Sequence, residues 1–119
     1  TEINCHFLVS DANGKSVILE YQDNEWKKTY PDKNWQVMTN KIIYHVPDAQ
    51  LREKCWRYNT ISALLDKTNG DVNWNEGMQV LKDVSQDGTT WSVIYLPNSN
   101  ELYFSVYQSW DKIYHVQGF

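Results

Sequence analysis

The apolar residues of this chain change their spacing twice along the sequence, and this change is the feature that most constrains its fold. The first third consists of short segments separated by turn residues, namely residues 5–10, 16–22, 26–30 and 35–39. Such segments predict strands joined by tight turns. Strand-like segments return at residues 91–96, 101–107 and 112–117. In the part of the sequence between these two groups, the apolar residues recur at helical spacing. Helices that are segregated from strands in this way predict an α+β fold with antiparallel sheets rather than a parallel βαβ fold.

Two helices are predicted between the two groups of strands. The first begins at Asp48 and runs for about 20 residues to a stop at residues 69–70. Its apolar stripe consists of residues at spacings of three and four: Leu51, Cys55, Tyr58, Ile61 and Leu65. The second helix begins at Asn73, where Glu76 provides the partner of a capping box, and it ends near Ser85.

The length and charge of the chain limit its organisation and its partners. A length of 119 residues suits a single domain spanning residues 1–119, since domains of roughly 100 to 150 residues are the most common. The 15 acidic and 11 basic residues give a formal charge of -4. Nucleic-acid binding requires a basic surface, so no nucleic-acid partner is expected. No apolar run approaches the roughly 20 residues that span a bilayer, so no membrane partner is expected either.

The sequence offers few residues for disulfides or metal binding. Its two cysteines are Cys5 and Cys55, whereas small secreted domains usually carry more disulfides, so we expect a reducing, cytoplasmic location. The three histidines and two cysteines show none of the two-to-five-residue spacings of structural zinc sites. Neither a metal nor another cofactor is expected.

The chain is rich in aromatic residues, with six tryptophans and eight tyrosines. One interpretation is an exposed platform for a sugar or lipid ligand. The other interpretation is that these residues pack in the hydrophobic core, because Trp and Tyr bury a large area and keep one polar group. Most of these residues fall at core-facing positions of the predicted elements, which favours the second interpretation.

Four stretches of the sequence resemble, in this order and at fitting distances, the carboxy-terminal part of the linear-amide C-N hydrolases. They are HFLVSDANGKSVILEY, WQVMTN, CWRY and TTWSVIYLPNSNELYFSVYQSWDKIYHV. That family includes choloylglycine (bile-salt) hydrolases, penicillin V acylases and related autoproteolytic acyltransferases. The resemblance covers nearly the whole chain, and the order of the stretches carries more weight than any single one.

The resemblance implies an N-terminal nucleophile hydrolase, with two stacked antiparallel sheets between helical layers in an αββα sandwich. In such enzymes the α-amino group of an amino-terminal cysteine accepts the proton of its own thiol. The thiolate then attacks the amide carbonyl, and preorganised donors stabilise the negative oxygen. The implied substrate is a small N-acyl amide, such as a bile-salt conjugate or penicillin V.

Two residues match catalytic positions of that family. Asn40, at the end of WQVMTN, matches the asparagine whose side-chain amide donates to the oxyanion; alternatively it is a strand-end residue that forms a side-chain turn. Arg57, in CWRY, matches a helical arginine whose charge favours the thiolate of the nucleophile. Its alternative function is a surface ion pair with Glu53 at i,i+4.

The chain departs from the family because it has no counterpart of the amino-terminal half. That half holds the nucleophilic cysteine, the arginine and aspartate that follow it, and a second oxyanion asparagine. The alignment places both Thr1 and Cys5 well inside a full-length member, so neither is the expected nucleophile. We therefore expect a fragment that is inactive alone, pairs with its missing half and self-associates. The alternative is a stand-alone α+β binding or structural domain without catalysis.

Overall fold

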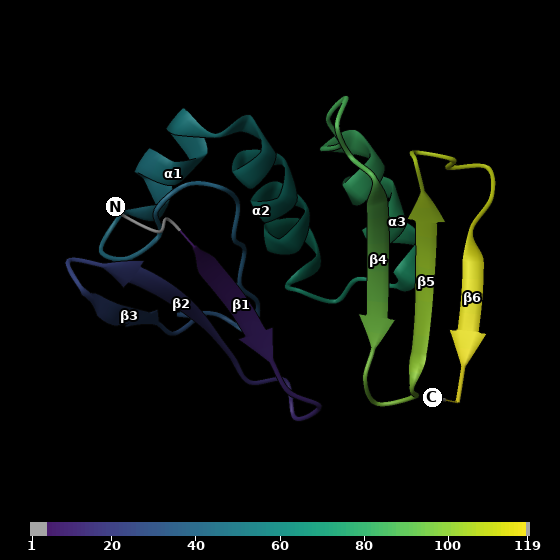
Figure 1. The fold of residues 1–119 in the computed structure, drawn as a ribbon, viewed down its shortest axis with the longest axis horizontal. Coiled ribbons are helices and arrows are strands. Elements are labelled where there is room, and N and C mark those ends of the chain that lie inside the picture. The colour runs from purple at the N-terminus through teal and green to yellow at the C-terminus, as the bar shows by residue number, and fades with distance from the viewer. Residues whose placement is uncertain (1–4, 119) are drawn as a thin grey trace. The chain divides into compact units, whose positions relative to one another are not determined.

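The computed structural model describes residues 5–118, and these form two compact units, each with one antiparallel sheet and at least one helix (Figure 1). Unit 1 comprises the described residues up to Gly70, and unit 2 comprises those from Asp71 onward. The predicted α+β class with antiparallel sheets is confirmed. The single-domain organisation of residues 1–119 stays a prediction. Among the described residues, no helix has the length and apolar character needed to cross a membrane.

Unit 1 contains a three-stranded meander and two helices. Its strands, in the order β1-β2-β3, and its helices are β1 His6–Ser10, β2 Ser16–Gln22, β3 Glu25–Thr29, α1 Asp48–Lys54 and α2 Trp56–Thr68. The turn between β1 and β2 is closed by Asp11, whose side chain accepts hydrogen bonds from the backbone N–H groups of Asn13 and Lys15. Asp and Asn favour such turns because their side chains bond to nearby backbone.

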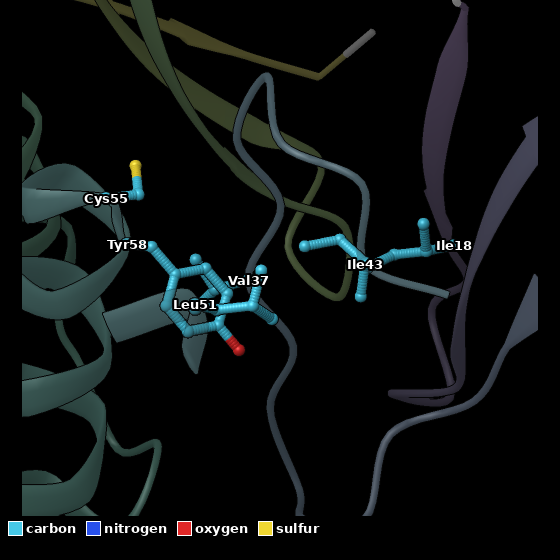
Figure 2. Close-up of a cluster of buried hydrophobic side chains, with 6 residues drawn as sticks. All are labelled: Ile18, Val37, Ile43, Leu51, Cys55 and Tyr58. Atoms are coloured by element: carbon cyan, nitrogen blue, oxygen red, sulfur yellow. The ribbon is translucent and has the colours of Figure 1, made fainter. Parts of the chain in front are cut away.

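The core of unit 1 joins its sheet, the segment between β3 and α1, and both helices (Figure 2). Its buried side chains are Ile18, Val37, Ile43, Leu51, Cys55 and Tyr58. Figure 2 shows Ile43 directed toward Ile18, so the connecting segment packs directly on β2. Complete burial of one aliphatic side chain of this kind stabilises a fold by roughly 1.5–3 kcal/mol.

The strand predicted over residues 35–39 is wrong, because these residues form an irregular segment without a strand ladder. Val37 and Thr39 are buried there, while Gln36 and Met38 are half-buried. The short segment that predicted a strand therefore has alternating burial without strand pairing. Side chains replace the ladder: Gln36 accepts from the Ser16 hydroxyl and donates to the carbonyl of Thr29, both over 2.8 Å.

The single long helix predicted from Asp48 is also wrong, since two helices, α1 and α2, occupy its place. Cys55 separates them with an extended backbone at φ -137 and ψ 104. Leu51, Cys55 and Tyr58 are all buried, so the helical spacing of apolar residues continues across the break. The described chain therefore has three helices rather than the two expected.

Unit 2 contains one helix and a second three-stranded meander, in the order β4-β5-β6. Its elements are α3 Trp74–Asp83, β4 Trp91–Leu96, β5 Glu101–Val106 and β6 Tyr114–Gln117. The last strand thus begins at Tyr114 rather than at the expected residue 112. The predicted capping box is confirmed, because Asn73 accepts from the backbone N–H of Glu76 and the Glu76 carboxylate accepts from the backbone N–H of Asn73.

Helix α3 covers one face of its sheet. A Cβ atom on Gly77 would lie 2.9 Å from Ile94 Cδ1, and the rings of Trp74 and Tyr103 stack 4.1 Å apart. The opposite face, which we call the outer face of unit 2, carries only apolar and aromatic residues. By strand register these are Trp91, Val93, Tyr95, Leu102, Phe104, Val106, Tyr114 and Val116.

The sheet of unit 1 has a similar outer face opposite its core. This face carries six apolar residues and one lysine: Phe7, Val9, Val17, Leu19, Tyr21, Trp26 and Lys28. The expectation that most aromatic residues fill the core is wrong. Trp26, Trp56 and Trp91 are 50%, 55% and 71% exposed. Tyr58 is the one tyrosine that is buried in the described chain.

We predict that replacement of Asn73 by Ala destabilises unit 2 by about 1 kcal/mol, because it removes the side-chain acceptor at the start of α3. Urea unfolding followed by circular dichroism measures this change. Asn75→Ala is the matched control, since Asn75 is exposed in the first turn of the same helix and does not form the cap. Equal midpoints for Asn73→Ala and the unaltered chain would show that the cap contributes nothing.

We also predict that the chain self-associates through the outer face of unit 2, because contiguous exposed apolar surface drives association. Sedimentation velocity measures the size distribution. The double variant Trp91→Lys, Val93→Lys places two charges on this face and shifts the distribution toward monomer. The control Asn75→Lys, Gln79→Lys adds the same charges to exposed positions of α3. A monodisperse monomer of the unaltered chain would contradict the prediction.

Candidate functional site

The structure brings together the two residues that the sequence singled out. Arg57 Nη2 donates a hydrogen bond of 2.6 Å to Asn40 Oδ1. Asn40 lies at the end of the irregular segment that follows β3, and Arg57 is the second residue of α2. Seventeen residues separate them in the sequence, so the contact depends on the packing of this segment against the helix.

A second contact between the same segment and helix α2 lies in the interior of unit 1. Thr39 Oγ1 lies 3.5 Å from Cys55 Sγ, and both residues are buried. Thr39 directly precedes Asn40, and Cys55 is the N-cap residue of α2. The segment and the helix are therefore joined by two neighbouring contacts, one buried and one at the surface. This pair of contacts fixes the position of Asn40 relative to Arg57.

The environment of Cys55 lowers the pKa of its thiol below the ordinary value. Burial acts in the opposite direction, since it disfavours the charged thiolate. The hydroxyl of Thr39, the backbone N–H groups of Tyr58 and Arg57, and the positive charge of Arg57 outweigh burial. The amino-terminal end of α2 is therefore a positive region that stabilises negative charge.

The side chain of Asn40 is exposed, and it lines a cavity of about 500 Å³. Because Arg57 occupies its carbonyl oxygen, the amide is oriented and its Nδ2 group faces away from the guanidinium. Two half-buried residues, Cys5 and His6, line the same cavity, together with the exposed ends of Lys41 and Lys54. The arrangement can present oriented N–H donors to an oxygen atom of a bound molecule.

The alternative function of Arg57, an ion pair with Glu53, does not occur among the ion pairs of the described residues. Glu53 belongs to α1 and Arg57 to α2, so the break at Cys55 removes their helical i,i+4 relation. In the described chain, the hydrogen-bonding partner of Arg57 is the neutral amide of Asn40.

The other residues considered as nucleophiles or metal ligands form no site in the described chain. Cys5 is a free, half-buried cysteine directly before β1, and Thr1 lies outside the described residues. The Thr39–Cys55 contact could not be predicted from the sequence, because Cys55 fits the apolar stripe of a helix. Residues 5–118 contain no group of three or more His, Cys, Asp or Glu that could hold a metal ion.

Comparisons of the chain with protein-family models, with curated proteins and with solved structures found no match. The resemblance to the linear-amide C-N hydrolases therefore stays a prediction from the four sequence stretches. The geometry of Asn40 and Arg57 is an independent observation, because it does not depend on any alignment.

We predict that replacement of Arg57 by Ala raises the pKa of Cys55 toward its ordinary value, because a stabilising positive charge is lost. The pH dependence of the Cβ NMR signal of Cys55 measures this in a Cys5→Ser background, where Cys55 is the remaining thiol. Lys54→Ala is the control, since Lys54 is an adjacent exposed cation and Arg57 is the cation that lowers this pKa. Titration of both variants at the same pH would contradict the prediction.

The same shift links Cys55 to stability. Its folded-state pKa lies below the ordinary value of 9.0, so the ionised thiol stabilises the fold above that pH. This contribution is lost as the pH falls through the lowered pKa. The Arg57→Ala variant therefore loses part of the stability that the unaltered chain gains at alkaline pH.

Proposed function

We propose that this chain is the carboxy-terminal part of a cysteine N-terminal nucleophile amidohydrolase or acyltransferase. The proposed enzyme acts on linear amide C–N bonds of N-acyl compounds, such as bile-salt conjugates or penicillin V. The observation that carries the proposal is the hydrogen bond of 2.6 Å between Arg57 Nη2 and Asn40 Oδ1. It joins the two residues that the family resemblance had selected separately.

The proposed function of Asn40 is to donate a hydrogen bond to the oxyanion. An amide held through its oxygen has a fixed orientation, so its Nδ2 donors need no rearrangement when negative charge develops on the substrate. Removal of one such donor typically costs roughly 3–4 kcal/mol of transition-state stabilisation. The exposure of Asn40 and its place beside a cavity are compatible with access by a substrate.

The proposed function of Arg57 is to orient Asn40 and to stabilise nearby negative charge. A cation in the first turn of a helix is unfavourable, because the amino-terminal end already carries partial positive charge. Among the described residues, no carboxylate forms an ion pair with Arg57 that would compensate this cost. Such an arrangement suits a site for an anion, here the thiolate of the nucleophile or the oxyanion that it generates.

The two sheets support the proposed architecture. Within each unit, one face of the sheet packs on helices or the core, and the outer face is apolar except for Lys28 in unit 1. Stacked sheets need apolar residues at alternate positions of each strand, on the faces that meet. Outer faces of this composition are what the αββα sandwich of N-terminal nucleophile hydrolases requires. We infer that the nucleophile belongs to the missing amino-terminal half, so the chain alone is inactive.

A second candidate function is a stand-alone α+β domain that binds a partner without catalysis. The exposed aromatic residues of the outer face of unit 2, Trp91 and Tyr95 among them, favour this candidate. The coding sequence upstream of Thr1 distinguishes the two. An upstream reading frame of more than about a hundred residues that starts at Met-Cys, or contains a cleavage-exposed Cys, supports the hydrolase. A start codon next to Thr1 supports the binding domain.

We predict that Asn40→Ala in the full-length parent lowers kcat by roughly a hundredfold to a thousandfold and leaves KM nearly unchanged, because the donor acts mainly in the transition state. Steady-state hydrolysis of an N-acyl substrate measures both constants. Asn59→Ala is the matched control, since Asn59 is an exposed asparagine of α2. Full activity of the Asn40→Ala enzyme would overturn the proposed function.

A further inference from the structure

Strand β2 carries a buried carboxylate that the proposed mechanism does not use. Glu20 is 3% exposed. Its Oε1 accepts the backbone N–H of Ile43 over 2.9 Å, and its Oε2 accepts the backbone N–H of Tyr44 over 2.7 Å. His6 Nδ1 lies 3.5 Å from Oε1. The carboxylate therefore binds two consecutive N–H groups of the segment that follows Asn40.

These hydrogen bonds explain why a carboxylate is tolerated at this position. A buried carboxylate is costly unless donors satisfy it, and here two successive backbone N–H groups donate to it. In return, the N–H groups of Ile43 and Tyr44, which belong to no strand or helix, gain acceptors. Charged acceptors form stronger hydrogen bonds than neutral ones.

We propose that Glu20 is a positioning residue for Asn40. This inference rests on the proposed function of Asn40 as an oxyanion donor. On the amino-terminal side of Asn40, Thr39 contacts Cys55. On its carboxy-terminal side, Glu20 holds the backbone at Ile43, whose side chain also enters the core. Asn40 is thus held between two anchors, one to α2 and one to β2.

The anchor matters because catalytic donors must be placed accurately. A misplacement of about 1 Å can cost roughly a hundredfold in rate. Loss of Glu20 would release the segment at residues 43–44 while the contact between Thr39 and Cys55 persists. We expect the side chain of Asn40 to move relative to Arg57 as a result.

The first test needs no substitution and uses hydrogen exchange of the 119-residue chain, followed by NMR. The described part of the chain provides no backbone or side-chain acceptor for the N–H groups of Lys41 and Ile42. We expect the amides of Ile43 and Tyr44 to exchange at least about tenfold more slowly than those two, relative to intrinsic rates. Equal protection of all four amides would overturn the proposal.

The second test is Glu20→Gln, which keeps the shape of the side chain. Its amide has one oxygen and one NH₂ group, so it satisfies one backbone N–H and directs a donor at the other. We expect faster exchange at Ile43 or Tyr44 and shifted NMR signals of the Asn40 side-chain NH₂ group. Glu53→Gln, at an exposed glutamate of α1, is the control and leaves both unchanged. Unshifted Asn40 signals in Glu20→Gln would overturn the proposal.

Activity of the full-length parent separates this inference from the proposed function. We expect Glu20→Gln to lower kcat by up to roughly a hundredfold with little change in KM, because donor placement matters in the transition state. Normal kcat in Glu20→Gln together with reduced kcat in Asn40→Ala would overturn the positioning function alone. Full activity of Asn40→Ala would overturn the proposed function, whereas the NMR results on the anchor would be unaffected.

Discussion

The segment from Trp35 to Val46 connects the sheet of unit 1 to its helices without any strand ladder, and its side chains must therefore hold it in place. Buried backbone groups need hydrogen-bonding partners, and here side chains provide several of them. Gln36 is bonded to Ser16 and Thr29, Thr39 contacts Cys55, and Glu20 accepts from Ile43 and Tyr44. The position of Asn40 is thus determined by tertiary contacts on both sides.

The break between α1 and α2 positions Arg57, the second residue of the candidate site. Because Cys55 is extended, α2 begins a new first turn, and Arg57 lies in that turn beside Asn40. Arg52 links the two helices through hydrogen bonds of 2.7 Å to Asp48 in α1 and to Asp66 in α2. Tyr58 donates to Asp48, and burial together with this bond raises its pKa to about 12.

Local patterns predicted the elements that local chemistry determines. The capping box at Asn73 was predictable because both partners lie within one helical turn, and the hairpins because their turns are short. The division of the long helix was not predictable, since the apolar spacing continues through Cys55. The alternation of side chains along β2 places Ile18 and Glu20 on one face of the sheet and Val17 and Leu19 on the other. It could not show which of the two faces the helices and the connecting segment would cover. Asn40 and Arg57 came from a family resemblance, and no spacing rule predicts a contact across seventeen residues.

The connectivity of the two sheets has a kinetic consequence. Every strand pairing in the described chain joins strands that are neighbours in the sequence. Pairings of this kind close short loops, and a low contact order is associated with rapid folding. The slower step in unit 1 is then the docking of residues 35–46 between sheet and helices, since it requires contacts such as Glu20 to Tyr44 and Asn40 to Arg57. The region that holds the site is therefore expected to order last, after the hairpins have formed.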